Sequence, residues 1–186
     1  MKDDTQLIDE ALAGDSAVFG QLVQKYQNRL FNTIVHVIGD RDEAEDVVQD
    51  AFVQAFVKLE TFRRNSAFYT WLYRIAFNVA VSRRRRRRPE LSVDQAREMT
   101  GDEPVDDAES PDQRLQRRER ARQVHEALAC LSEQHRSILV LREMEGCDYE
   151  TIAEILGLPV GTVRSRLHRA RSQLRDQLKQ VLQEHP

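Results

Sequence analysis

The chain has 186 residues, a formal net charge of −3 and 40% hydrophobic residues. This length and apolar content suit one or two small domains with packed cores. The N-terminal residues 1–6 lack the apolar stretch of a signal peptide, and no apolar run reaches membrane-spanning length. We therefore expect a cytoplasmic protein without membrane insertion.

The two cysteines, Cys130 and Cys147, lie outside any CxxC or Cys/His spacing typical of a metal site. We expect two free thiols, no disulfide, no metal and no cofactor. The net charge conceals a segregation, because residues 83–88 are six consecutive arginines and residues 90–112 hold nine acids and one base. Since the local distribution of charge matters more than the total, the negative sum does not exclude DNA binding.

Apolar residues recur at helical spacing throughout the first half of the chain, and no segment alternates as a strand would. Capping residues set the boundaries. Asp15 or Ser16 can begin a long helix that Gly39 ends, and Asp40 with Glu43 resembles a capping box. The predicted elements are helices over residues 4–13, 16–38 and 40–59, a loop over 61–65, and a helix that Ser66 caps and that continues into the arginines.

The stretch from residue 61 to residue 78 concentrates aromatic residues in a chain that has 6% of them, and arginines are interleaved. Trp71 and Phe68 suit a core position, whereas Tyr69, Tyr73 and Arg74 lie on a different face of the predicted helix. Aromatic rings beside arginines suit the stacking of unpaired bases together with neutralisation of phosphates. An aromatic-rich core helix is the alternative interpretation.

Residues 89–111 lack periodicity and carry three prolines and a glycine. They predict an acidic linker, disordered when free, between two domains. Helices follow, the second of them capped by Ser132.

The final segments predict a helix-turn-helix. Asp148 can cap a short helix that Gly157 ends in a left-handed conformation, and Pro159 can open the next helix, which runs to about residue 183. Val163 and Leu167 form the buried stripe of that last helix, and most of its arginines lie off the stripe. A buried helix followed by a basic, exposed one is the arrangement that enters a DNA major groove. Ordinary helical packing is the alternative.

Three segments in order resemble the extracytoplasmic-function group of bacterial RNA polymerase sigma factors. The resemblance lies in residues 46–52 (DVVQDAF, region 2.2), residues 66–78 (SAFYTWLYRIAFN, regions 2.3–2.4) and residues 159–171 (PVGTVRSRLHRAR, region 4.2). It implies an all-α fold of two small helical domains, with region 2 over residues 1–88 and region 4 over residues 112–186, joined by the flexible acidic linker 89–111.

The resemblance also implies three sets of binding residues. Duplex DNA at the minus-thirty-five element would contact Arg164, Ser165, Arg166, His168, Arg169 and Arg171. The melted single strand of the minus-ten element would contact Phe62, Ser66, Ala67, Phe68, Tyr69, Tyr73, Arg74 and Asn78. The clamp helices of the polymerase β′ subunit would contact Asp46, Gln49, Asp50 and Phe52, the last as an aromatic anchor.

Three positions depart from the family pattern, two of them in the loop before the aromatic helix. The loop reads Phe-Arg-Arg-Asn-Ser over residues 62–66, where the common form is Phe-Arg-Gly-Asp-Ser. Arg64 replaces a glycine that adopts positive φ easily, and Asn65 replaces a charged aspartate. This departure bears on the path of the loop and on its base preference. His168 stands where relatives often carry phenylalanine.

The partners that the resemblance implies are core RNA polymerase, through its β′ clamp helices and β flap, promoter DNA, and an anti-sigma factor, with no obligate homo-oligomer. The run at residues 83–88 would attract phosphates and make binding salt-dependent, or would only solvate a helix end. The acidic linker would mimic nucleic acid in the RNA-exit channel of the polymerase, or would only be a solubilising tether.

No carboxylate pair, nucleophile–base arrangement or glycine-rich phosphate loop points to catalysis, so we expect a transcription initiation factor that is not itself an enzyme. One alternative is a helix-turn-helix regulator that binds duplex DNA as a dimer, which leaves the aromatic segment unexplained. The other is a single-strand RNA-binding protein, which leaves the recognition helix unexplained.

Overall fold

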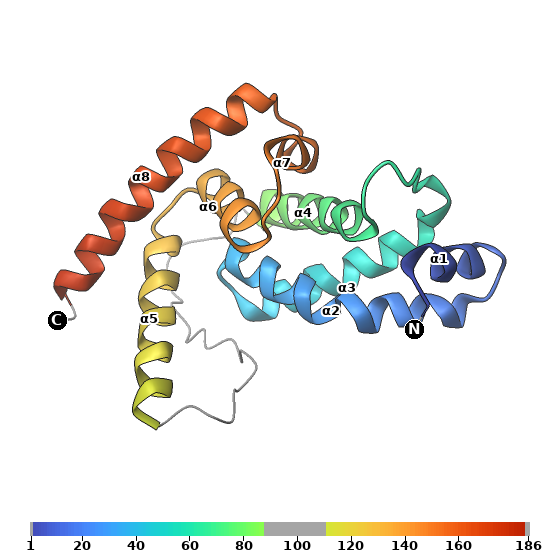
Figure 1. Cartoon of the computed structure of the whole chain (residues 1–186), viewed down its shortest axis with the longest axis horizontal. Coiled ribbons are helices and arrows are strands. Elements are labelled where there is room, and N and C mark those ends of the chain that lie inside the picture. The colour runs from blue at the N-terminus through green and yellow to red at the C-terminus, as the bar shows by residue number, and fades with distance from the viewer. Residues whose placement is uncertain (1, 88–110, 185–186) are drawn as a thin grey trace.

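The computed structural model describes residues 2–87 and 111–184, and all regular structure in these two ranges is helical (Figure 1). The first half contains α1 (Asp4–Leu12), α2 (Ser16–Ile38), α3 (Arg41–Val57), the short turn η1 (Leu59–Thr61) and α4 (Phe68–Arg87). The second half contains α5 (Pro111–Ala129), α6 (Glu133–Leu139), the π-helical turn η2 (Val140–Met144), α7 (Tyr149–Leu156) and α8 (Val160–Glu184). The predicted all-α class is confirmed, and the predicted linker lies almost entirely outside the described residues.

Short-range hydrogen bonds place most helix ends where the sequence predicts them. The carboxylates of Asp15, Asp40 and Asp148 each accept a backbone N–H of the first turn that follows. Gly39 and Gly157 end α2 and α7 with φ of 85° and 64°. These conformations suit glycine, because it has no Cβ to clash with the backbone.

Two predicted boundaries near the aromatic segment are wrong. α3 ends at Val57, and the chain then forms η1. α4 begins at Phe68, and the carbonyl of Ala67 accepts the N–H of Trp71 at 3.3 Å. Ser66 is therefore not the capping residue, because the helical hydrogen bonds start one residue after it.

The two halves share one continuous buried cluster. Leu22 and Leu72 are fully buried in the first half, as are Ile138 and Ile152 in the second. α2 packs against α6 and η2, and α4 packs against α7, which lies beside it in Figure 1. Burying this apolar surface is the main stabilising contribution, so the contact between the halves adds to the stability of both.

None of the helices among the described residues is both long enough and apolar enough to cross a bilayer. Both cysteines are free, with Cys130 exposed and Cys147 half-buried.

Candidate nucleic-acid and polymerase interfaces

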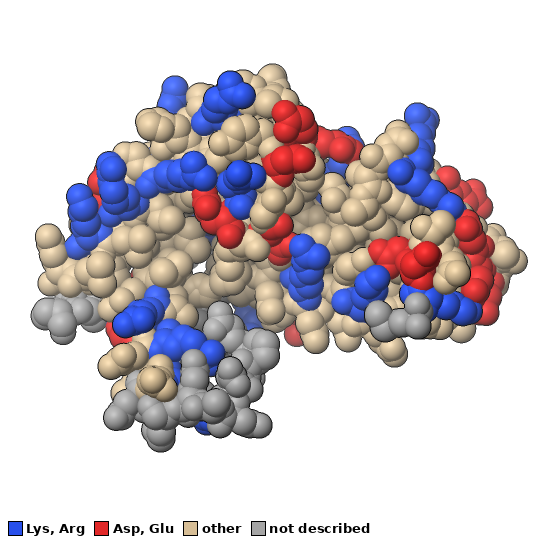
Figure 2. Space-filling model, in the orientation of Figure 1, with Lys and Arg blue, Asp and Glu red and all other residues tan. Residues whose placement is uncertain are grey.

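The second helix of the helix-turn-helix has one buried face and one basic face. Val163, Leu167 and Ala170 are at most 1% exposed and fix α8 against its neighbours. The spacing of a helix then turns the intervening residues outward. Five of the residues predicted for the duplex are exposed, and Arg166 is half-buried; the exposed ones are Arg164, Ser165, His168, Arg169 and Arg171. Lysine and arginine side chains gather along α8 in Figure 2.

Local contacts already order some of these side chains. Arg164 lies over the ring of Tyr149, with its guanidinium carbon 5.9 Å from the ring centre. The hydroxyl of Ser165 donates to the carbonyl of Thr162 at 3.1 Å. Arg171 differs from the others, because its Nε and Nη2 donate to Oε1 of Glu143 at 2.8 and 2.7 Å. In this structure Arg171 is thus paired within the protein.

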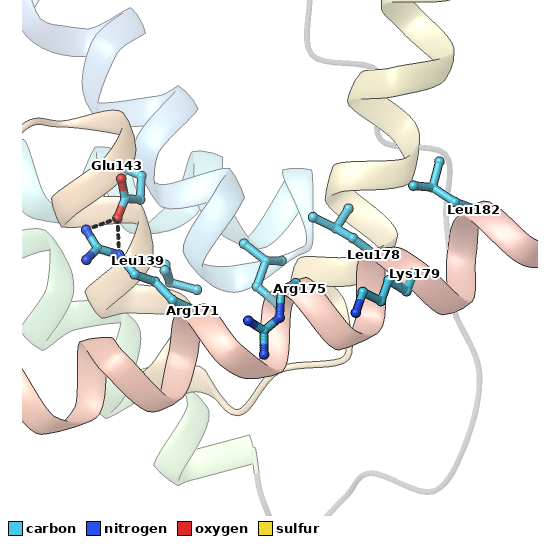
Figure 3. A pocket seen from close by; sticks show the side chains of 8 residues that line it. Leu139, Glu143, Arg171, Arg175, Leu178, Lys179 and Leu182 are labelled. Atoms are coloured by element: carbon cyan, nitrogen blue, oxygen red, sulfur yellow. Dashed lines mark hydrogen bonds and ion pairs between the residues drawn. The ribbon is translucent and has the colours of Figure 1, made fainter.

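Beyond Arg171, α8 carries an apolar groove with a basic rim. Leu174, Leu178 and Leu182 recur at one-turn spacing and line this groove together with Leu139 of α6; Leu139, Leu178 and Leu182 are labelled in Figure 3. Arg171, Arg175 and Lys179 form a parallel basic stripe at the same spacing. Such a surface suits the apolar face of an amphipathic helix that carries acidic residues beside it.

The residues predicted for the single strand divide into an exposed set and a buried set. Ala67, Arg74 and Asn78 are exposed. Phe62 is half-buried, with its ring centre 5.8 Å from that of Phe68 and 5.2 Å from that of Trp71. Ser66 is also half-buried.

Three aromatic side chains of the predicted single-strand set are buried. Phe68 is 2%, Tyr69 9% and Tyr73 1% exposed. Phe68 belongs to the core of the first half, as expected. The tyrosines, predicted to lie on a separate face, are covered where α7 packs on α4 and η2 packs on α2. Burial raises the pKa of both tyrosines well above their usual value, so both stay neutral.

The loop before α4 keeps a positive φ despite the absence of glycine. Arg64 has φ of 57°, in the left-handed region, and is the single non-glycine residue with positive φ among the described residues. Its guanidinium pairs with Asp9 of α1, at a contact between exposed side chains. The loop therefore adopts the conformation that a glycine at this position would adopt with less strain.

The predicted polymerase-binding face of α3 is partly acidic, and Arg83 of α4 contacts it. Arg83 donates from Nη1 to Asp46 at 2.9 Å and from Nε and Nη2 to Asp50 at 3.0 and 2.6 Å. The first arginine of the run thus ties α4 to α3. The side chains of residues 84–88 are not described.

Phe52, predicted as the aromatic anchor for the polymerase, is 7% exposed and belongs to the core. The exposed apolar side chains of α3 are instead Val53 at 63%, Phe56 at 45% and Val57 at 74%. Val53 and Val57 follow Asp50 at helical spacing and so continue the face that carries Gln49, which is itself exposed. Helical spacing from Asp46 and Asp50 could have identified them from the sequence.

Comparison with known proteins identifies both halves of the chain. Residues 22–90 match the family model for Sigma-70 region 2, and residues 121–174 match that for Sigma-70, region 4. The chain is 43% identical over 186 residues to the RNA polymerase sigma-H factor of Pseudomonas aeruginosa. The aligned region covers 97% of this chain and 96% of that protein. It is 36% identical over 184 residues to the ECF RNA polymerase sigma-E factor of Haemophilus influenzae, with 96% and 97% covered.

A solved structure agrees with these matches. The sigma factor RpoE of Bartonella quintana, determined in complex with the anti-sigma factor NepR, has a TM-score of 0.70 and 27% identity over 87% of this chain and 96% of that chain. The chain therefore belongs to the extracytoplasmic-function sigma factors of the sigma-70 family, and it directs transcription initiation by bacterial RNA polymerase through regions 2 and 4.

Proposed function

We propose that this sigma factor reads the minus-thirty-five element as duplex DNA with α8 and the minus-ten element as a melted single strand with α4 and the loop before it. The observation that carries the proposal is the basic, exposed face of α8, which the buried Val163 and Leu167 hold outward. The polymerase performs the nucleotidyl transfer and the sigma factor supplies promoter selection. The start of α5 at Pro111 supports a region 4 domain that begins near residue 112.

In region 4 we assign base reading to Arg164, Ser165, His168 and Arg169, because these side chains are exposed on one face. An arginine that reaches the O6 and N7 atoms of guanine contributes about 1–3 kcal/mol of discrimination. Arg171 is paired with Glu143, so we assign it to a phosphate contact that forms when the phosphate replaces the carboxylate of Glu143.

In region 2 we assign the single strand to the exposed Arg74 and Asn78 and to the rings of Tyr69 and Tyr73 once these are uncovered. Extruding a base costs about a few kcal/mol of stacking and pairing. Stacking on an aromatic ring returns about 1–3 kcal/mol per base, so these rings supply a contribution of the required size.

For the polymerase we assign the β′ clamp helices to α3, with Asp46 and Asp50 as the acidic part and Val53 and Val57 as the apolar part. A basic helical partner can form ion pairs with the carboxylates of Asp46 and Asp50 when Arg83 releases them. The groove of α6 and α8 suits the β flap, and an anti-sigma factor would compete for these surfaces. NepR bound to the similar RpoE supports a regulator of this kind.

Transcription in vitro with core polymerase on a pool of random promoters tests the proposal. We expect promoter-specific transcripts whose shared sequences fall in two blocks upstream of the start site. Arg169→Ala should relax the consensus of the upstream block, and Arg74→Ala should weaken selection of the downstream block. The matched control Arg120→Ala, at an exposed residue of α5, should change neither consensus. Tight binding of the purified chain alone to a palindromic duplex, with no transcript, would contradict the proposal and favour a dimeric regulator.

A further inference from the structure

A polar cavity of about 520 Å³ lies between α3 and α4, which pack against each other. Its polar lining comes from the end of α3 and the second half of α4, namely Asp50, Gln54, Lys58, Asn78, Ser82 and Arg83. All of these side chains except that of Asp50 carry hydrogen-bond donors, and the phosphate oxygens of DNA accept from such groups. The lining therefore suits an anion, apart from one carboxylate.

The guanidinium of Arg83 is held at this cavity by two carboxylates of α3. Its nitrogens donate to Asp46 and Asp50, which lie one helical turn apart. Carboxylates at this spacing repel each other, so Arg83 neutralises an arrangement that is unfavourable alone. The side chains of Arg83, Asp46 and Asp50 are 31%, 57% and 48% exposed. Ion pairs in contact with water contribute little net stability, so other partners can replace them.

The charges around the cavity are balanced in the free chain. Arg83 and its two carboxylates together carry one net negative charge, and Lys58 adds one positive charge. The ammonium of Lys58 donates to Oε1 of Gln54 at 3.3 Å, within α3. Because no net positive charge remains, a phosphate gains no electrostatic advantage in the cavity.

The polymerase changes this balance. The proposed function places the basic β′ clamp helices on the carboxylates of Asp46 and Asp50. Once these carboxylates pair with the polymerase, Arg83 has lost its partners and lies beside Lys58 on the cavity lining. The planar fork of an arginine suits a phosphate, which accepts two parallel hydrogen bonds from it.

We propose that the cavity between α3 and α4 binds a backbone phosphate of promoter DNA through Arg83 and Lys58 when the polymerase holds Asp46 and Asp50. The inference rests on the proposed function, since that function assigns α3 to the clamp helices and α4 to DNA. Polymerase binding then raises the affinity of region 2 for DNA, and by linkage DNA raises the affinity for polymerase by the same factor. Arg83 is the residue that the two equilibria share.

Removal of the shared cation tests the exchange on the full chain. Arg83→Ala should bind core polymerase about threefold more tightly than wild type, because the carboxylates of α3 no longer have a partner inside the protein. Fluorescence anisotropy measures the affinity, and far-ultraviolet circular dichroism should show unchanged helical content. The matched control is Arg122→Ala, because Arg122 also joins two carboxylates, those of Glu119 and Glu126, at 2.6 and 2.7 Å. It should leave the affinity unchanged.

The salt dependence of DNA binding reports the phosphate contact. The probe is a promoter selected by transcription in vitro, with its downstream block single-stranded, bound to core polymerase together with the sigma factor. Loss of one phosphate contact lowers the slope of log K against log salt by about 0.7–0.9. We expect this reduction in Arg83→Ala, with about a fivefold loss of affinity at low salt. Arg83→Lys should keep the slope because it keeps the charge, and Arg122→Ala should match wild type.

Neutral carboxamides at the α3 pair should replace the effect of polymerase. Asp46→Asn combined with Asp50→Asn frees Arg83 in the isolated chain, which should bind the same DNA about fivefold more tightly than wild type at low salt. Adding Arg83→Ala should remove most of this gain. Glu119→Gln combined with Glu126→Gln makes the same charge change on α5 and should give a smaller gain. An equal gain in that control would contradict the release of Arg83.

The outcomes separate the failure of this inference from that of the proposed function. An unchanged salt slope in Arg83→Ala would overturn the phosphate site and leave the assignment of α3 to the polymerase intact. Unchanged affinity of Arg83→Ala for core polymerase would overturn the exchange, because Arg83 would not compete with the polymerase. Undiminished polymerase binding by the variant with Asp46→Asn and Asp50→Asn would overturn the assignment of α3 to the clamp helices, and this inference with it.

Discussion

A single glycine at the end of α2 meets two requirements at once. Gly39 has φ of 85°, which a side chain strains, and a Cβ built on it would lie 3.0 Å from Nη1 of Arg136. That guanidinium is buried and donates to the carbonyls of Val37 and Ile38 at 3.3 Å. The C-terminus of α2 is thus stabilised by a cation of region 4, as the helix dipole favours.

We predict that Gly39→Ala lowers the free energy of unfolding by about 1–2 kcal/mol, from the positive φ and the crowding of Arg136. Urea denaturation of the full chain measures it. The control is Gly20→Ala, in the interior of α2 with no atom within 4 Å of the added Cβ. It should raise stability by up to about 1 kcal/mol, because alanine favours the helix. Equal effects of the two substitutions would show that the backbone of Gly39 and the guanidinium of Arg136 impose no strain on a side chain at position 39.

For single residues, the sequence predicts the features that depend on neighbours along the chain and misses those that depend on distant residues. The caps at Asp40 and Asp148 are local, since the carboxylate and the N–H groups it accepts lie three residues apart, and both were predicted. The positive φ of Arg64 was not predicted, because nothing in an arginine side chain favours that conformation. The contact of Arg64 with Asp9 joins positions 55 residues apart, which no local pattern reveals.

The helix α3 shows how an element can be predicted correctly while the burial of one aromatic side chain, Phe52, is predicted wrongly. Its apolar residues cover more than one face, and helical spacing from Asp46 and Asp50 separates Val53 and Val57 from the buried Phe52. Packing against α2 and α4 buries Phe52 and leaves Val53, Phe56 and Val57 exposed. An exposed apolar strip beside Asp46 and Asp50 is typical of a docking surface rather than of a solvated face.

We predict that Val57→Asp weakens binding to core polymerase about tenfold or more, because it places a charge in the apolar part of the α3 surface. Stability should change by less than about 0.5 kcal/mol, since the side chain is exposed. Fluorescence anisotropy with labelled sigma factor measures the affinity. Leu115→Asp is the matched control, as Leu115 is 69% exposed on α5. Equal loss of affinity in both variants would show that α3 is not the docking surface.

At the scale of the whole molecule, a histidine pair adds a pH dependence to the contact between the halves. The rings of His36 in α2 and His125 in α5 have centres 4.4 Å apart. Burial, and then the proximity of His125, lower the pKa of His36 to about 4. Burial also lowers the pKa of His125, and the neighbouring Glu126 acts in the opposite direction. Both rings are therefore neutral in the packed molecule near neutral pH.

The unfolded chain has the higher histidine pKa, so it binds protons first as the pH falls. The contribution of the buried, neutral His36 to the free energy of unfolding is fully present above about pH 6.5. It is lost as the pH falls from about 6.5 to 4. We predict that the free energy of unfolding falls by about 2 kcal/mol more between about pH 7 and pH 5 in wild type than in His36→Gln. Urea denaturation at both pH values measures it. An identical pH dependence in the two proteins would contradict the burial of a neutral His36.

The packing of region 4 on region 2 could not be predicted from the sequence, although the helices of each region were predicted separately. Tyr69 and Tyr73 lie off the core face of α4, which made exposure the natural expectation. Arg29 and Thr33 of α2 contact Tyr69. In addition α7, about eighty residues further along the chain, packs on α4, as the pair Arg74–Glu154 shows. The spacing of apolar residues indicates which face of a single helix is buried, and it gives no information about contacts between distant helices.

Promoter opening directly tests whether two separate surfaces of one chain read duplex and single-stranded DNA when the polymerase holds them. Permanganate detects unpaired thymines on a promoter selected by transcription in vitro. We expect reactive thymines in the downstream block when core polymerase and this chain are both present, and none with either component alone. Upstream duplex protection that persists without polymerase, together with no reactive thymine in the complex, would contradict this expectation.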